Sequence, residues 1–233
     1  GDSYTGLMMT LAISIAYYYK KITGRGQRLD VSMLDAMFST IEDAVLAYSA
    51  DGRIMTRTGN MRPDQFAPYD TYNCKDGEIA LGILDDNMWN EFCTAFDESR
   101  LITEPLYKTN ELRCKNIEKL TEDVQNVFSE MTLKEIMDKA CDSDFPIAPV
   151  NTPLGAMHHQ QLTERHMVVP IDDKGLGSYE AFGVPVKLSR TPGEIVKGAP
   201  LLGEDTEKIL KEIGYSEAQI NMLVESGAVE CAG

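Results

Sequence analysis

The sequence predicts an α/β protein of two domains, on three observations. Apolar residues recur at helical spacing along much of the chain. Two strand-like runs, 69–74 and 78–83, flank Lys75-Asp76-Gly77, and Asp-Gly between such runs is a strong hairpin signal. A polar and basic stretch with glycine and proline at 51–67 predicts a linker before these strands. A length of 233 residues allows one large domain or two smaller ones.

The first element is an apolar run at 7–19 that follows Gly1-Asp2-Ser3-Tyr4-Thr5-Gly6. The run is apolar on nearly every side, which predicts a helix buried among other elements, and it is shorter than the about 20 residues of a membrane span. Asp2 and Ser3 stand where an N-cap belongs. Asp2 is therefore either a helix cap or a nucleophile, because a carboxylate at a helix N-terminus stays ionised.

The next segment predicts an α–turn–β–α unit. Two lysines and two glycines at 20–27 suit the C-terminus of the first helix. Alternation at 28–32 predicts a short strand, and apolar residues at helical spacing predict one helix over 33–50.

A small second domain begins with the hairpin. Helices are predicted at 87–96 and 110–131, and Thr132 to Glu135 forms a capping box that opens a third. Two prolines confine the extended segment 145–150 to a sheet edge.

The last third of the chain predicts short elements. Residues 198–203 precede a helix, so this segment is either a turn that docks the last helices or an anion-binding loop. The other predictions are a helical connection at 152–166, extended pieces at 168–169 and 184–186, a helix at 204–213, and a final helix opened by the capping box at 216–219.

Charge and cysteine usage exclude several classes of protein. The chain has 22 Lys and Arg against 37 Asp and Glu, a net charge of −15, which excludes a nucleic-acid partner. Five widely spaced cysteines without a C-x-x-C pair predict reduced thiols in a cytoplasmic protein. No signal peptide or membrane span is expected, and an opening without Met suggests a piece of a longer protein.

The three histidines do not predict a metal site. His158, His159 and His166 lie in the connecting region, and adjacent histidines cannot point the same way on a helix. Solvent-exposed side chains are expected instead.

Six blocks, in order and spacing, resemble family III CoA-transferases, the group that includes formyl-CoA, carnitine and bile-acid CoA-transferases and α-methylacyl-CoA racemase. These blocks are Gly1-Asp2-Ser3-Tyr4-Thr5-Gly6, Thr23-Gly24-Arg25-Gly26-Gln27, Arg57-Thr58-Gly59-Asn60, Tyr72-Asn73-Cys74-Lys75-Asp76-Gly77, Asn87-Met88-Trp89 and Ala199-Pro200-Leu201-Leu202-Gly203-Glu204.

The resemblance implies that Asp2 is the catalytic nucleophile. Its carboxylate would attack an acyl-CoA thioester to give a mixed anhydride, the CoA thiolate would return to give an aspartyl-CoA thioester, and a carboxylic acid would collect the CoA. Coenzyme A would thus be a substrate and no cofactor would be permanently bound. Met33 matches a position that lies against CoA, and a buried core methionine is the alternative.

The resemblance also implies an architecture. Family members are about twice as long and begin with a Rossmann-like half, absent here, and two chains interlock as a homodimer. Residues 1–52 would end the large domain, 53–66 would be the linker, 67–155 the small α+β domain, and 156–233 the return to the large domain.

Two alternatives remain. An α-methylacyl-CoA racemase or epimerase would use the same aspartate in proton transfer, although Ser3 leans toward the transferases. A non-catalytic assembly subunit would bind no CoA ester.

Overall fold

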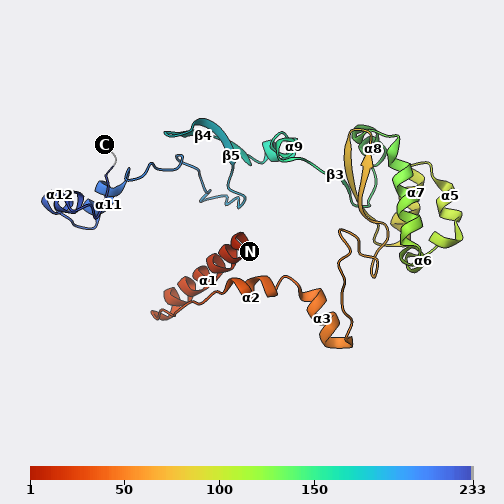
Figure 1. The fold of residues 1–233 in the computed structure, drawn as a ribbon, viewed down its shortest axis with the longest axis horizontal. Coiled ribbons are helices and arrows are strands. Elements are labelled where there is room, and N and C mark those ends of the chain that lie inside the picture. The colour runs from red at the N-terminus through yellow and green to blue at the C-terminus, as the bar shows by residue number, and fades with distance from the viewer. Residues whose placement is uncertain (232–233) are drawn as a thin grey trace. The chain divides into compact units, whose positions relative to one another are not determined.

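The computed structural model describes residues 1–231 of this chain, and Figure 1 labels most of its helices and strands. The fold is mixed α/β, with small sheets and many helices, as the sequence predicts. Packing divides the chain into two compact units. The first consists of Gly1–Lys75 and Ala80–Ile147, and the second of Asp76–Ile79 and Ala148–Gly233.

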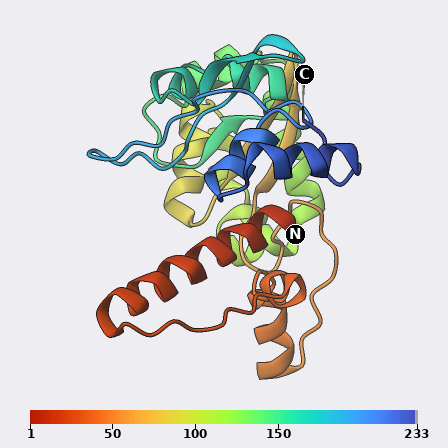
Figure 2. The ribbon, with the colours of Figure 1, turned by 90° about the vertical axis from the view of Figure 1, so that its left-hand side faces the viewer.

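The first unit begins with the helix α1 (Asp2–Thr23), which Figure 2 shows as one uninterrupted helix in red. It ends at Gly24, whose φ of 72° is left-handed and whose N–H donates to the Lys20 carbonyl at 2.8 Å. Glycine suits this position because it has no Cβ to clash there.

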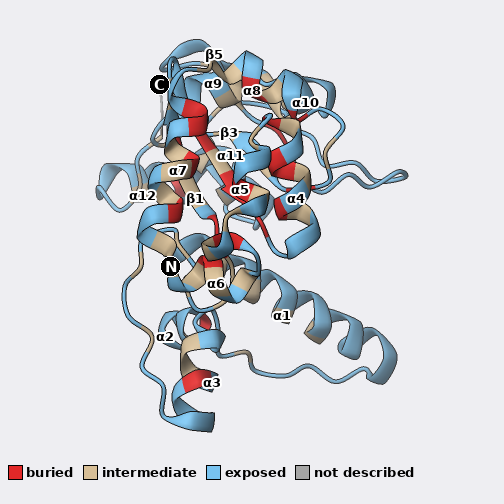
Figure 3. Ribbon diagram, turned by 90° about the vertical axis from the view of Figure 1, so that its right-hand side faces the viewer, coloured by how far each residue is buried: buried red, intermediate tan, exposed pale blue. Residues whose placement is uncertain are grey.

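The predicted helix at 7–19 is confirmed, but its predicted burial is wrong. No residue of α1 is buried, and Leu7 and Ile15 are 63% and 58% exposed. Figure 3 shows this helix without the red that marks buried residues. An apolar helix is buried only where another element covers it, and among the described residues α2 packs against only part of α1.

Two further predictions for this segment are wrong. Residues 28–32 form no strand, because nothing in the described chain pairs with them. The predicted helix at 33–50 is broken into α2 (Met33–Phe38) and α3 (Glu42–Asp51). At the break the Ser39 and Thr40 hydroxyls donate to preceding carbonyls at 2.7 Å each, a local bonding pattern that competes with a helix.

A three-stranded sheet of order β1-β2-β3 follows the linker. The predicted hairpin is confirmed as β1 (Tyr69–Cys74) and β2 (Gly77–Gly82), and the predicted edge segment contains β3 (Ile147–Pro149). Gly82 N–H donates to the Pro146 carbonyl at 2.9 Å.

Helices pack with β1 and β2 to form the core of the first unit. The structure differs from the prediction in two places. The predicted helix at 110–131 is split at Asn116, whose side chain donates to the Leu112 carbonyl at 2.8 Å, and a short helix at Ser99–Thr103 was not predicted. The capping box at Thr132 is confirmed. The helices are α4 (Asp86–Ala95), α5 (Ser99–Thr103), the 3₁₀ helix η1 (Pro105–Tyr107), α6 (Asn110–Lys115), α7 (Ile117–Ser129) and α8 (Leu133–Lys139).

The centre of this core is aromatic. Phe92 has no exposed surface and contacts Trp89, Phe96, Phe128 and Phe145 at ring-centroid distances of 5.1 to 6.0 Å. Such pairs add about 0.5–1.5 kcal/mol each beyond their area burial. Figure 3 shows the buried positions along α4 and α7 in red.

One charged side chain is part of this core. Arg113 has no exposed surface, and its Nε donates to the Ala67 carbonyl at 2.7 Å. Its Nη1 and Nη2 donate to the carbonyls of Tyr107 and Asp85 at 3.1 and 3.3 Å. The guanidinium therefore joins three chain segments through backbone oxygens.

The second unit holds an antiparallel pair, β4 (Val168–Asp173) and β5 (Gly177–Phe182). The predicted extended piece at 168–169 lies in β4, whereas 184–186 forms no strand. The helices of this unit, including the predicted capping box at 216–219, are α9 (Pro153–Met157), α10 (Gln160–Glu164), α11 (Thr206–Glu212) and α12 (Glu217–Glu225).

None of the helices in the described part of the chain is both long and apolar enough to cross a membrane.

Candidate functional site

Asp2 is the first helical residue of α1, and Gly1 is the N-cap. The backbone N–H and the Oγ1 of Thr5 both donate to the Gly1 carbonyl, at 3.0 and 2.8 Å. In the described residues the Asp2 side chain makes no capping hydrogen bond, which disfavours its alternative interpretation as a helix cap. These bonds fix the first turn without using the Asp2 carboxylate.

The Asp2 carboxylate is exposed, and within residues 1–231 it makes no hydrogen bond or ion pair. It stands at the N-terminus of a 22-residue helix, where the first backbone N–H groups are unpaired and the helix dipole is positive. An unpaired carboxylate in that position is accessible to an electrophile.

Met33, the second predicted site residue, lies beside this corner. A Cβ on Gly1 would stand 3.4 Å from the Met33 sulfur and 3.7 Å from its Cγ. Met33 is 52% exposed, which disfavours its alternative interpretation as a core methionine. Ser32 caps α2 by accepting from the Asp35 N–H at 3.3 Å, which holds the first turn of α2 in place. The structure thus places the Met33 side chain beside Gly1, the residue that precedes Asp2.

The block at 199–204 is braced by an aspartate that the sequence analysis did not single out. Asp173 Oδ1 accepts from the N–H groups of Gly175 and Leu176 at 2.8 Å each, and Oδ2 accepts from Ala199 N–H at 3.1 Å. These three hydrogen bonds lower the pKa of the Asp173 carboxyl. The bond from the Leu176 N–H has the largest effect, followed by those from Gly175 and Ala199. The signal was available, because aspartate before a Lys-Gly turn commonly bonds backbone N–H groups two residues on.

The same bracing decides between the two interpretations of 198–203. Its Ala199 N–H already binds an anion, and that anion is the chain's own Asp173 carboxylate. Lys174 Nζ also pairs with Glu204 Oε1 at 2.6 Å, and Glu204 Oε2 accepts from Leu201 N–H at 2.8 Å. The segment is therefore a braced turn.

The three histidines are exposed, as predicted. His159 has a structural role, because its Nδ1 accepts from Gln161 N–H at 3.2 Å and caps α10. In the described residues, no group of three or more His, Cys, Asp or Glu side chains is arranged to hold a metal ion. No disulfide bond links any of the five cysteines, all of which lie in the described residues.

The chain belongs to CoA-transferase family III, whose profile matches residues 1–206. An acyl-CoA transferase from Fusarium pseudograminearum is 31% identical over 230 residues, which is 98% of this chain and 50% of that protein. A succinyl-CoA:mesaconate CoA-transferase from Haloarcula marismortui is 29% identical over 215 residues, which is 92% of this chain and 53% of that protein.

The fold also resembles that of a solved protein. The crystal structure of a CAIB/BAIF family protein from Brucella suis matches with a TM-score of 0.76 at 24% identity, over 90% of this chain and 54% of that one. The chain thus spans about half the length of the relatives it matches.

Proposed function

We propose that this chain carries the nucleophile of a CoA-transferase that moves CoA from an acyl-CoA thioester to a carboxylic acid. The observation that carries the proposal is the exposed, unpaired Asp2 carboxylate at the start of α1. Family membership supports the reaction class. Two relatives named as transferases of acyl-CoA or succinyl-CoA support it further.

The proposed reaction proceeds through Asp2 in covalent steps. A carboxylate oxygen attacks the thioester carbonyl, the C–S bond breaks, and CoA leaves as a thiolate, so that Asp2 holds the acyl group as a mixed anhydride. The thiolate then attacks the Asp2 carbonyl, releasing the first acid and forming an aspartyl-CoA thioester. The carboxylate of the second acid attacks this thioester, the C–S bond breaks, and a second mixed anhydride forms as the CoA thiolate is released. The thiolate then attacks the carbonyl of the second acid in this anhydride, which forms the new acyl-CoA and frees the Asp2 carboxylate.

The surroundings of Asp2 suit a group that alternates between anion and ester. The positive end of the α1 dipole favours the free carboxylate at the start and end of the cycle. Met33 offers a polarisable thioether next to Gly1, and we assign it a contact with CoA.

The proposed architecture follows the family. Residues 1–52 would complete a Rossmann-like large domain, 53–66 would be the linker, 67–155 the small α+β domain, and 156–233 the return to the large domain. The likeness to longer relatives supports this division, and a second copy of the chain in an interlocked homodimer is the proposed partner.

The proposal is tested by intact-mass spectrometry after incubation with a panel of short acyl-CoA esters. We expect an adduct on Asp2, and borohydride, which reduces an aspartyl thioester to homoserine, should mark the residue permanently. Asp2→Asn should abolish the adduct, since an amide is a poor nucleophile.

The matched control is Asp35→Asn, which changes an exposed aspartate in the first turn of α2. This variant should keep the adduct. An adduct that survives in Asp2→Asn would exclude Asp2 as the nucleophile. Exchange of the proton next to the thioester carbonyl without any adduct would favour racemase chemistry.

A further inference from the structure

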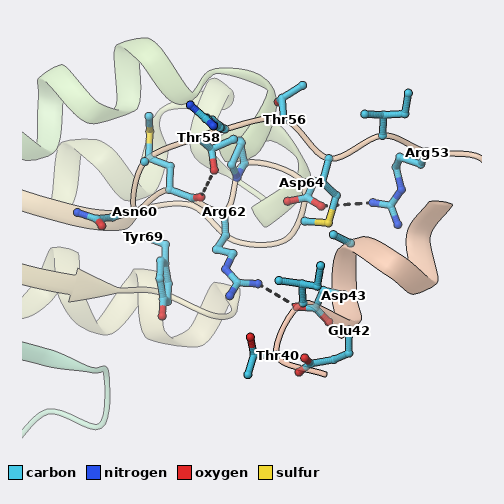
Figure 4. A pocket seen from close by; sticks show the side chains of 18 residues that line it. Thr40, Glu42, Asp43, Arg53, Thr56, Thr58, Asn60, Arg62, Asp64 and Tyr69 are labelled. Carbon is cyan, nitrogen blue, oxygen red and sulfur yellow. Dashed lines mark hydrogen bonds and ion pairs between the residues drawn. The ribbon is translucent and has the colours of Figure 1, made fainter. Parts of the chain in front are cut away.

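A cavity of about 740 Å³ lies along the linker, between the start of α3 and the start of β1 in the first unit. Its volume is within the range of about 300–1,000 Å³ that small-molecule sites occupy. Three arginines line it, together with three acidic side chains, and Figure 4 shows the cavity at close range. These six residues are Arg53, Arg57, Arg62, Glu42, Asp43 and Asp64.

Two of the three arginines are already paired. Arg62 Nη1 lies 3.2 Å from Asp43 Oδ2, and Arg53 Nη1 lies 3.3 Å from Asp64 Oδ2. The dashed lines in Figure 4 mark both pairs. Each aspartate of the cavity thus neutralises one arginine.

Arg57 is the remaining cation. Within residues 1–231 it makes no ion pair and no hydrogen bond. Its neighbour Thr58 donates from Oγ1 to the Met61 carbonyl at 2.8 Å, which closes the turn after Arg57. The site therefore has a fixed backbone beside an uncommitted guanidinium.

The third acidic side chain of the cavity is that of Glu42. Figure 4 shows Glu42 apart from Thr56 and Thr58, and in the described residues no ion pair joins Glu42 to an arginine of the cavity. The chain as a whole carries a net charge of −15, so the unpaired arginine in this cavity wall is a local positive charge on a strongly negative chain. Such a cation in the wall of a concave space attracts an anion.

We propose that Arg57 is an anion-binding residue and that this cavity holds an oxyanion group of a substrate, either a carboxylate or a phosphate. A guanidinium binds both groups with two parallel N–H···O bonds. The choice of ligand rests on the proposed function, because the substrates of a CoA-transferase include carboxylic acids and the phosphates of CoA. The site itself is independent of Asp2, and Arg57 takes no part in bond breaking.

The test follows the arginine Nε–Hε signals of the 233-residue chain by NMR during titration with succinate and, separately, with adenosine 3′,5′-bisphosphate. We expect a saturable shift of the Arg57 signal with at least one of the two. Saturation with succinate alone assigns the site to a carboxylate, and saturation with the bisphosphate alone assigns it to a CoA phosphate. Dimethyl succinate, which carries no charge, should cause no saturable shift.

Variants decide whether Arg57 is responsible. Arg57→Gln should weaken the binding about tenfold or more, and Arg57→Lys should keep part of it, because a lysine retains the charge without the planar fork. Arg28→Gln, which removes an exposed arginine outside the cavity, should leave it unchanged. Equal binding by Arg57→Gln, or no saturation with either anion, would overturn the inference.

The titration also separates this inference from the proposed function. Asp2→Asn should bind the anion as the unaltered chain does. An Asp2 adduct with no response at Arg57 would overturn the anion site alone. Anion binding at Arg57 with no adduct on Asp2 would leave the site standing and overturn the transferase mechanism.

Discussion

Arg113 Nη1 lies 2.9 Å from Asp86 Oδ1, although the Arg113 side chain has no exposed surface and that of Asp86 is 51% exposed. Burial is the largest effect on the guanidinium and lowers its pKa, while the hydrogen bond and charge of Asp86 oppose that effect. The guanidinium also lies 5.2 Å from the centre of the Trp89 ring. A buried cation of this kind is tolerated because an aspartate, three carbonyls and an aromatic face surround it.

Replacing Arg113 should destabilise the first unit strongly. In Arg113→Met the carbonyls of Ala67 and Tyr107 lose their donor inside the core, and we expect the free energy of unfolding to fall by about 3 kcal/mol. Trp89 is the one tryptophan of the chain, so its fluorescence during urea unfolding reports on this core.

The control is Lys115→Met, two positions along the same helix. Within residues 1–231 the one ion pair of Lys115 is an exposed pair with Glu111 at 2.6 Å, so its replacement should change the free energy of unfolding by less than about 0.5 kcal/mol. Equal effects of the two replacements would refute a special role for Arg113.

The brace at Asp173 should weaken at low pH. Its folded-state pKa is lowered by the N–H groups of Leu176, Gly175 and Ala199. The stabilisation is therefore complete above the unfolded pKa of about 3.9 and is lost as the pH falls through the lower, folded value. NMR shifts of the Leu176 and Ala199 amides should titrate with a midpoint below about 3.9.

A midpoint at or above the unfolded value would contradict these hydrogen bonds. In Asp173→Asn the amide shifts of Leu176 and Ala199 should no longer follow this titration, because the carboxylate is gone.

Gly198 should not tolerate a side chain. A Cβ there would lie 2.5 Å from Asp173 Oδ2 and 3.0 Å from Asp173 Cα, and the Cα cannot rotate away. Gly198→Ala should therefore break the bond from Ala199 N–H to Asp173 and speed hydrogen exchange of that amide about tenfold.

Gly26→Ala is the matched replacement, because a Cβ at Gly26 would meet nothing within 4 Å. It should leave the exchange of Ala199 unchanged. Unaltered exchange in Gly198→Ala would show that the turn can move aside.

Two cysteines should differ sharply in reactivity. Cys93 has no exposed surface, and burial raises the pKa of its thiol to about 12, an effect that nearby Arg113 partly offsets. Cys141 is exposed. Since the thiolate is the reactive form, N-ethylmaleimide should label Cys141 in the folded chain and Cys93 only in urea. Peptide mass spectrometry measures both, and Cys141→Ser removes the fast label. Rapid labelling of Cys93 without denaturant would refute the buried placement.

Local signals in the sequence predicted local structure well. The hairpin at Asp76-Gly77 and the capping boxes at Thr132 and Ser216 are all confirmed, because each depends on residues within a few positions of one another. The strand at 28–32 was wrong, because a strand needs a partner that a run of alternating residues does not specify.

Contacts between distant residues could not be predicted. Three partners of Arg113 are backbone carbonyls, which every residue has, so no residue type in the sequence marks those three. The position of Met33 beside Gly1 depends on how α2 packs against α1, and the pairing of Arg53 and Arg62 that leaves Arg57 alone depends on the path of the linker. The residues of the candidate site were named from a resemblance, whereas their surroundings came from the fold.

The bond from Arg113 to the Ala67 carbonyl spans 46 positions of the chain. Bringing such distant groups together costs more chain entropy than forming a hairpin or a helix turn does. Contacts between residues far apart in the sequence also slow folding. The hairpin and the helix that carries Arg113 can form while the guanidinium is still hydrated. We therefore expect Arg113 to make this bond after the rate-limiting step of folding, so that its loss shortens the lifetime of the folded state more than it delays folding.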